Sequence, residues 1–300
     1  TLKGHTDNVK AVSITADGKK AISASEDKTC ILWDVDSGSV LKTFKVHTSR
    51  VNAISISADG KRALSGSYLR TCTIWDLESG KKIKTLGGIT AICITADGKQ
   101  ALSGLNNGNC ILWNLDDEKK LEIPGSDISV VKAISISADG KRALLGYLNN
   151  TCKLWDLDSG ELLKTLIGHK ESISSVSITA DGKIAISGSY DCTCKLWDLE
   201  SGNLLKTFIG HNESVNGVDI SVDGKRAISG SADNTCILWN IDGKEEINKF
   251  SGHTKKITTV SISVDRKRAI SGSYDNTCKL WQLQKGKVLR TLKDHNRNVM

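Results

Sequence analysis

The chain has 300 residues, of which 39% are hydrophobic and 25% charged, and 41 Lys and Arg residues against 34 Asp and Glu give a net charge of +7. No apolar run approaches the roughly 18 residues of a membrane helix and no signal-peptide pattern leads the chain, which excludes a helical membrane protein and indicates a soluble globular one. The positive charge permits an acidic or nucleic-acid partner, so the placement of the charges matters more than their sum.

Seven tryptophans divide the chain into similar units, at Trp33, Trp75, Trp113, Trp155, Trp197, Trp239 and Trp281. Their separations are 42, 38, 42, 42, 42 and 42 residues, the mark of a repeat architecture. Each unit holds four short alternating segments separated by turn signals, which predicts four β-strands. A unit this small cannot bury both sheet faces, so we expect a single all-β domain over residues 1–300, a closed seven-bladed β-propeller of four-stranded antiparallel blades.

A histidine lies 28 residues before the tryptophan in five units, at positions 5, 47, 169, 211 and 253. This spacing, together with the recurrent Trp-Asp pair, resembles the WD40-repeat family along the whole chain. The first hairpin departs from the family pattern, because most units have Ala-Asp-Gly without proline and the chain has one proline, Pro124.

The resemblance implies a buried hydrogen-bond network in each blade, running from tryptophan through a strand serine and a loop histidine to a turn aspartate. Family precedent selects the first serine of each Ser-x-Ser pair. Four units carry all four residues: His5, Ser23, Asp27 and Trp33; His169, Ser187, Asp191 and Trp197; His211, Ser229, Asp233 and Trp239; and His253, Ser271, Asp275 and Trp281.

Units 2 to 4 have lost parts of this network. Unit 2 has Leu69 in place of aspartate, unit 3 lacks the histidine and has Asn107, and unit 4 has Asp127, Leu145 and Asn149 at the equivalent positions. Each unpaired buried polar atom costs about 1 to 3 kcal/mol. Two interpretations stay open: drift in an over-determined ring, or an arc softened or reshaped for a partner.

Neither an enzyme nor a metal or cofactor site is expected. The His, Asp and Ser sets resemble a hydrolytic triad, but their recurrence and their tryptophan partner favour a structural role. Seven of the nine cysteines occupy equivalent positions and are interpreted as buried, reduced residues of a cytoplasmic protein. The pair Cys192 and Cys194 lacks further zinc ligands, and the acidic turn at Asp34 and Asp36 lacks a later bidentate glutamate.

By resemblance, one face of the ring displays variable residues in its loops. They precede the turn aspartate or flank the first strand of each unit: Glu26, Tyr68, Asn106, Leu148, Tyr190, Ala232 and Tyr274, and Asn8, Lys10, Arg50, Asn52, Lys132, Ser174, Asn216 and Thr258. The scaffold, in contrast, repeats "AISISADGKRAL" identically at 53–64 and 133–144. Tyrosines suit an interface anchor, although tyrosine as a common loop filler is the alternative.

The opposite face mixes basic pairs such as Lys61 and Arg62 with acidic turns, which disfavours a nucleic-acid site. Residues 291–299 restart the pattern of residues 1–9, so we expect 294–300 to begin an eighth unit or to be surplus, within a larger protein. The sequence favours a non-catalytic module that binds a protein or peptide on the loop face and contacts other domains of its own chain, without a membrane partner. Self-assembly, nucleic-acid binding and an enzyme site in the central channel are the alternatives.

Overall fold

The structure, a computed structural model, describes residues 4–45, 47–69, 71–87, 91–117, 119–125, 129–242, 246–283 and 287–292. These residues form seven antiparallel sheets of four consecutive strands each, which confirms the predicted all-β architecture of seven blades. The described part of the chain contains no helix long and apolar enough to cross a membrane. The expected eighth unit at 294–300 lies outside the described residues.

Each of the first four blades is built from one continuous stretch of chain. Blade 1 contains β1 (Val9–Ile14), β2 (Lys20–Ser25), β3 (Cys30–Asp34) and β4 (Val40–Phe44). Blade 2 contains β5 (Val51–Ile56), β6 (Arg62–Ser67), β7 (Thr71–Asp76) and β8 (Lys82–Gly87). Blade 3 contains β9 (Ala91–Ile94), β10 (Gln100–Gly104), β11 (Cys110–Asn114) and β12 (Lys120–Ile123). Blade 4 contains β13 (Val131–Ile136), β14 (Arg142–Tyr147), β15 (Thr151–Asp156) and β16 (Leu162–Ile167).

The last three blades follow the same order. Blade 5 contains β17 (Ile173–Ile178), β18 (Ile184–Ser189), β19 (Thr193–Asp198) and β20 (Leu204–Ile209). Blade 6 contains β21 (Val215–Ile220), β22 (Arg226–Ser231), β23 (Thr235–Asn240) and β24 (Glu246–Ser251). Blade 7 contains β25 (Ile257–Ile262), β26 (Arg268–Ser273), β27 (Cys278–Gln282) and β28 (Lys287–Leu292).

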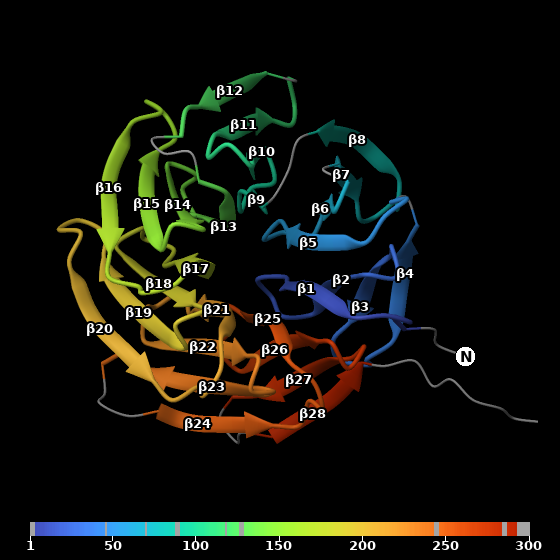
Figure 1. Ribbon diagram of the computed structural model, residues 1–300. Coiled ribbons are helices and arrows are strands. Elements are labelled where there is room, and N and C mark those ends of the chain that lie inside the picture. The colour runs from blue at the N-terminus through green and yellow to red at the C-terminus, as the bar shows by residue number, and fades with distance from the viewer. Residues whose placement is uncertain are drawn as a thin grey trace, which may run out of the picture.

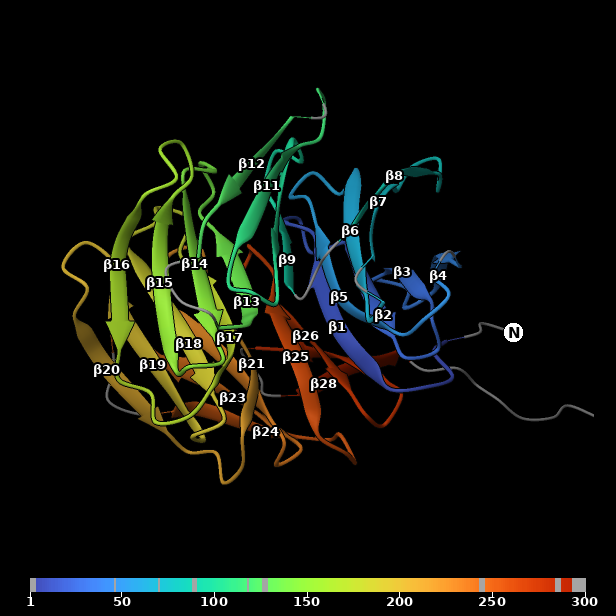
Figure 2. The same cartoon turned by 45° about the horizontal axis from the view of Figure 1, so that its top comes forward.

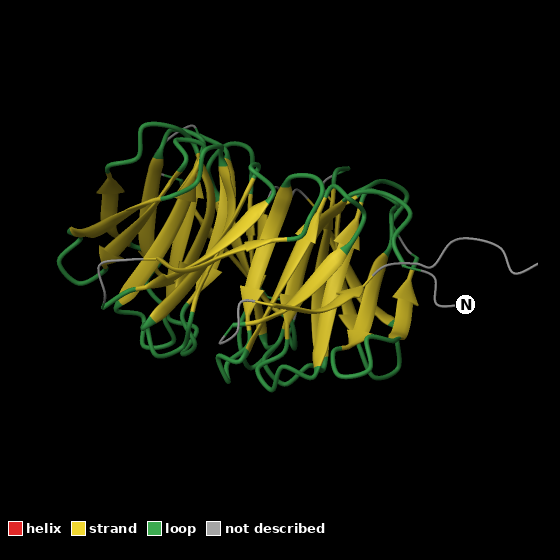
Figure 3. Cartoon of the chain, turned by 90° about the horizontal axis from the view of Figure 1, so that it is seen from below, coloured by secondary structure: helices red, strands yellow, loops and turns green. Residues whose placement is uncertain are grey.

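The blades stand around a central axis, with the first strand of each blade innermost and the fourth on the circumference (Figures 1 and 2). Each inner strand contacts the inner strand of the next blade, and β25 contacts β1, so the ring is closed. Seen from the side, loops and turns form two faces at opposite ends of the strands (Figure 3). One face holds the β1–β2 and β3–β4 turns and their equivalents, and the other, here called the loop face, holds the β2–β3 loops and the connections between blades.

The Ala-Asp-Gly motif explains the first turn of blades 1 to 5. In blade 1 the Asp17 carboxylate accepts hydrogen bonds from the Thr15 hydroxyl at 2.6 Å and from the backbone N–H of Lys19 at 2.9 Å. Gly18 follows with a φ of 67°, a left-handed conformation that glycine adopts without steric cost. The turn is therefore specified locally and proline is not required.

Apolar side chains fill the interfaces between blades. A separate buried cluster lies at each of the seven interfaces, and the cluster between blades 7 and 1 joins Ile270 and Leu280 to Val9 and Trp33. Glycine lets the sheets approach closely, since a Cβ atom on Gly272 would lie 2.7 Å from Cγ1 of Val9. Burial of these faces is the main stabilising contribution, as expected for blades that cannot bury both faces alone.

The ring closes without exchange of a strand between blades. The outer strand β28 belongs to the same stretch of chain as the rest of blade 7, and side chains join that blade to blade 1. The Thr258 hydroxyl donates to the carbonyl of Val9 at 2.8 Å, and the Arg268 guanidinium donates to the Asp36 carboxylate at 2.6 Å. The junction thus repeats the packing found between the other blades.

Serines on the inner strands connect neighbouring blades by hydrogen bonds. The Ser135 hydroxyl accepts the backbone N–H of Ile178 at 3.1 Å, and Ser177 accepts that of Ile220 at 3.3 Å. In blade 6 the equivalent residue is Asp219, whose carboxylate accepts the N–H of Ile262 at 2.7 Å and the Ser177 hydroxyl at 2.7 Å. Burial raises the pKa of Asp219 although these hydrogen bonds oppose the shift.

Candidate functional site

The four complete sets of blade residues are joined by hydrogen bonds in blades 1, 5, 6 and 7. In blade 1, Trp33 Nε1 donates to Ser23 Oγ at 2.8 Å, His5 Nε2 lies 2.7 Å from the same oxygen, and His5 Nδ1 lies 2.9 Å from the Asp27 carboxylate. The other three blades have the same contacts within 0.1 Å. Because the carboxylate can only accept, His5 carries its proton on Nδ1, and Ser23 donates to Nε2.

This network fixes the loop at the end of each complete blade. Burial raises the pKa of Asp27, but the hydrogen bonds that it accepts from His5, Thr29 and the backbone N–H of Thr6 outweigh burial and lower the pKa to about 2. The pKa values of Asp191 and Asp275 are lowered for the same reasons. The Ser23 hydroxyl is fully buried and already bonded on both sides, so it cannot reach a substrate as a nucleophile.

A cysteine extends the network across the interface to the preceding blade. Burial raises the pKa of the Cys278 thiol to about 12, and its hydrogen bond with Ser23 in blade 1 opposes this shift only in part. Cys30, Cys152, Cys194 and Cys236 have the same kind of contact with the serine of the blade that follows each of them. In these five blades the cysteine is therefore a small buried side chain next to the serine of the following blade. Among the described residues, no group of three or more His, Cys, Asp and Glu residues is arranged to hold a metal ion.

Blades 2 and 3 keep only part of the network. In blade 2, Ser65 accepts from Trp75 at 2.8 Å and lies 2.7 Å from His47, but Leu69 takes the place of the aspartate and is 60% exposed. In blade 3 the Trp113 indole donates to Ser103 at 2.9 Å, and the side-chain oxygen of Asn107 accepts the backbone N–H of Asn109 in its own loop. The loops of both blades lack the histidine-to-aspartate contact within the described chain.

Blade 4 has lost the acceptor of its tryptophan. Trp155 is 4% exposed, and its Nε1 has no hydrogen-bond partner among the described residues, because Leu145 stands where the serine would be. Tyr147 lies two residues after Leu145 on the same strand, and its hydroxyl lies 3.5 Å from the carbonyl of Gly108 in blade 3. Asp127, at the position of the histidine, lies outside the described residues.

The loop-face residues meet at the mouth of the central channel. A cavity of about 450 Å³ is lined there by Lys10, Glu26, Arg50, Asn52, Tyr68, Lys132, Ser174, Tyr190, Asn216, Lys256, Thr258 and Tyr274. These residues come from six of the seven blades, so ring closure assembles the cavity. All except Lys256 were predicted from the sequence as loop-face residues. Lys256 occupies the position before the first strand, as Asn8 and Arg50 do, and the same positional rule could have found it.

Some predicted residues lie outside this lining. Asn8 does not line the cavity but contacts a residue that does, since its side-chain amide donates to the Glu26 carboxylate at 2.7 Å. Asn106 and Leu148 are exposed on loops of blades 3 and 4, and neither lines the cavity, nor does the half-buried Ala232. The sequence pattern identified the face, but it could not tell which of its residues turn toward the axis.

The lining contains four cationic side chains and a single carboxylate, Glu26. Glu26 lies 3.6 Å from both Lys10 and Arg50. Burial raises the pKa of Glu26, but the Asn8 hydrogen bond and these two charges outweigh it, so the pKa is lowered. Two tyrosine rings are covered by cations: the Arg50 guanidinium lies 4.4 Å from the centre of the Tyr68 ring, and Lys256 Nζ lies 4.0 Å from that of Tyr274.

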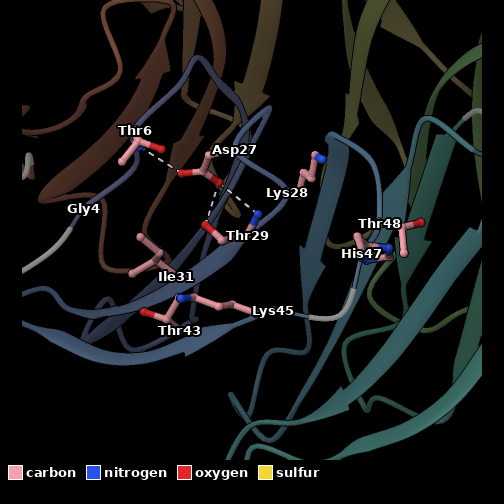
Figure 4. Close-up of a pocket in the computed structure, with 10 residues that line it drawn as sticks. All are labelled: Gly4, Thr6, Asp27, Lys28, Thr29, Ile31, Thr43, Lys45, His47 and Thr48. Atoms are coloured by element: carbon pink, nitrogen blue, oxygen red, sulfur yellow. Dashed lines mark hydrogen bonds between the residues drawn. The ribbon is translucent and has the colours of Figure 1, made fainter.

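A second cavity lies between blades 1 and 2, near the start of the described chain (Figure 4). It has a volume of about 640 Å³, and its lining includes Asp27, Lys28, Lys45 and His47. Asp27 and the histidine face this space from different blades, and burial lowers the pKa of His47. The cavity is thus the place where the intact network of blade 1 adjoins the incomplete network of blade 2.

The sequence profile of the family described as "WD domain, G-beta repeat" matches residues 1–34, 38–76, 160–198, 202–240 and 244–282, more than half of the chain. The chain belongs to the WD40-repeat family. The matched segments leave out 77–159, the stretch that contains Trp113 and Trp155. The structure nevertheless gives the described part of this stretch the strand order of WD40 blades. The departures lie in the hydrogen-bonding residues and in the length of two strands of blade 3, β9 and β12, which have four residues each.

A WD40 relative is the small ribosomal subunit protein RACK1 of Candida albicans, which is 46% identical over 44 residues. The aligned part covers 15% of this chain and 14% of that protein, about the length of one repeat. The similarity therefore supports the family and the fold. WD40 propellers typically serve as scaffolds that bind other proteins.

Proposed function

We propose that this propeller is a non-catalytic interaction module whose loop face binds a protein or peptide around the mouth of the central channel. The observation that carries the proposal is the cavity there, in which residues from six blades converge. Large apolar side chains surround the same face, since Tyr68 is 59%, Leu148 47% and Tyr190 42% exposed. Exposed tyrosine side chains are enriched among the residues that anchor protein interfaces.

The incomplete arc supports the same proposal. Leu69 and Leu148 are exposed on the loop face of blades 2 and 4, where the hydrogen-bond network is broken. A loop freed from the histidine-to-aspartate contact can adapt to a partner at lower cost than one held by the complete network. We therefore favour an arc reshaped for binding over simple drift.

The proposal for the larger protein rests on analogy with other WD40 arrays. We propose one propeller domain over residues 1–300, acting as the scaffolding or partner-sensing part of a larger cytoplasmic signalling protein. Seven buried thiols, all free, are compatible with a reducing compartment.

Site-specific photo-crosslinking tests the function. A benzophenone amino acid in place of Tyr190 should crosslink a partner in cells that express the protein. The matched control replaces Val222, which lies in a turn of the opposite face and is 45% exposed, close to the 42% of Tyr190. Crosslinks from position 190 and not from 222 would support the proposal, and crosslinks from 222 alone would contradict it.

A further inference from the structure

We infer that the partner presents an acidic peptide segment, one of whose carboxylate side chains enters the channel mouth. This inference rests on the proposed function and adds the chemistry of the partner. Its first basis is charge: the cavity lining has four cationic side chains against one carboxylate. Glu26 is already engaged by Lys10, Arg50 and Asn8.

Two lysines of the lining are available for an anion. Lys132 and Lys256 are exposed, and no described carboxylate pairs with either of them. On the opposite face, several arginines are held in ion pairs between blades. Arg62 lies 3.1 Å from Asp116, Arg268 pairs with Asp36, and Arg266 pairs with Asp223. Lysines of the opposite face such as Lys141 and Lys225 are exposed as well. The channel mouth is distinguished because Lys132 and Lys256 line the same cavity.

The lining also needs a hydrogen-bond donor from its ligand. The side-chain oxygen of Asn52 is buried and has no partner among the described residues. A peptide can supply both a donor and an anion, since its backbone N–H can donate to Asn52 while its side-chain carboxylate accepts hydrogen bonds from the lysines. A simple anion offers only acceptors, so the pairing favours a peptide.

Single-stranded nucleic acid fits the same surface less well. Such ligands bind by stacking bases on exposed aromatic rings. Two of the three tyrosines in the lining already have a ring covered by a cation, Tyr68 by Arg50 and Tyr274 by Lys10 and Lys256. The neighbouring Leu69 and Leu148 instead suit the apolar residues of a peptide.

The test is fluorescence anisotropy with a labelled peptide of glutamate, leucine and glycine at low salt. Two further probes are the same peptide with glutamine in place of glutamate, and a short oligothymidylate. The test variant is Lys132→Glu with Lys256→Glu. Its matched control, Lys141→Glu with Lys225→Glu, makes the same change of net charge at exposed positions on the opposite face.

We expect the acidic peptide to bind, the test variant to weaken its binding by about tenfold or more, and the control variant to change it little. Three results would overturn the inference: no binding of the acidic peptide, equal binding of the glutamine peptide, or equal loss in both variants. Tighter binding of the oligothymidylate with the same sensitivity to Lys132 and Lys256 would replace the peptide by a nucleic acid. If crosslinking from position 190 succeeds while these results are negative, the proposed function stands and only the acidic chemistry fails.

Discussion

The unpaired indole of Trp155 allows a direct measurement of what the blade network contributes. Replacing Trp155 by Phe removes an N–H that has no described partner, whereas Trp197→Phe in blade 5 removes an N–H that donates to Ser187 at 2.8 Å. The two rings are buried alike, 4% and 1% exposed, so the loss of ring volume nearly cancels in the comparison.

The expected difference follows from hydrogen-bond energetics. Losing a satisfied hydrogen bond costs about 0.5 to 1.5 kcal/mol, and removing an unsatisfied buried donor recovers about 1 to 3 kcal/mol. Trp155→Phe should therefore destabilise the protein by about 1.5 to 4.5 kcal/mol less than Trp197→Phe. Trp113→Phe also breaks a hydrogen bond, but it should destabilise the protein less than Trp197→Phe because Trp113 is only half-buried.

Urea unfolding followed by circular dichroism measures the free energy of unfolding of each variant. Equal slopes with denaturant are required, because they show that the unfolded states are comparable. Equal destabilisation by Trp155→Phe and Trp197→Phe would refute the reasoning, since Nε1 of Trp155 would then have a partner as good as Ser187.

Three further predictions concern the junction, acid stability and thiol reactivity. Gly272→Ala should destabilise the ring by about 1 to 3 kcal/mol, because the added Cβ meets Val9, whereas Gly87→Ala, with open space around it, should be nearly neutral; equal unfolding midpoints would contradict the packing at the junction. The folded-state pKa of Asp27, about 2, lies below its ordinary value of 3.8, so the stability that Asp27 contributes is present above about pH 4 and is lost as the pH falls toward 2. Asp27→Asn should therefore reduce the fall of the urea unfolding midpoint between about pH 4 and pH 2. The same fall in the variant as in the unchanged protein would count against the network. Native titration with an aromatic disulfide reagent should modify Cys192 first and the seven buried repeat cysteines only on unfolding; rapid reaction of a buried thiol would show that a blade interface opens.

The sequence predicted the architecture because the period of the tryptophans and the turn motifs is local information. It also located the broken networks, since Leu145 cannot accept the hydrogen bond that a serine would. The assembly of the channel mouth is different, because Lys10 and Tyr274 meet only when blade 7 closes on blade 1. The availability of Lys132 and Lys256 likewise depends on where carboxylates from other blades lie, which no single repeat specifies.

The proposed peptide site depends on the cationic cavity of the loop face, which Lys132 and Lys256 both line. The most direct test measures crosslinking in cells from a benzophenone at position 190 in the two charge-reversed backgrounds. We expect Lys132→Glu with Lys256→Glu to abolish the crosslink and Lys141→Glu with Lys225→Glu to preserve it. Equal crosslinking in both backgrounds, or loss only in the second, would contradict the proposed site.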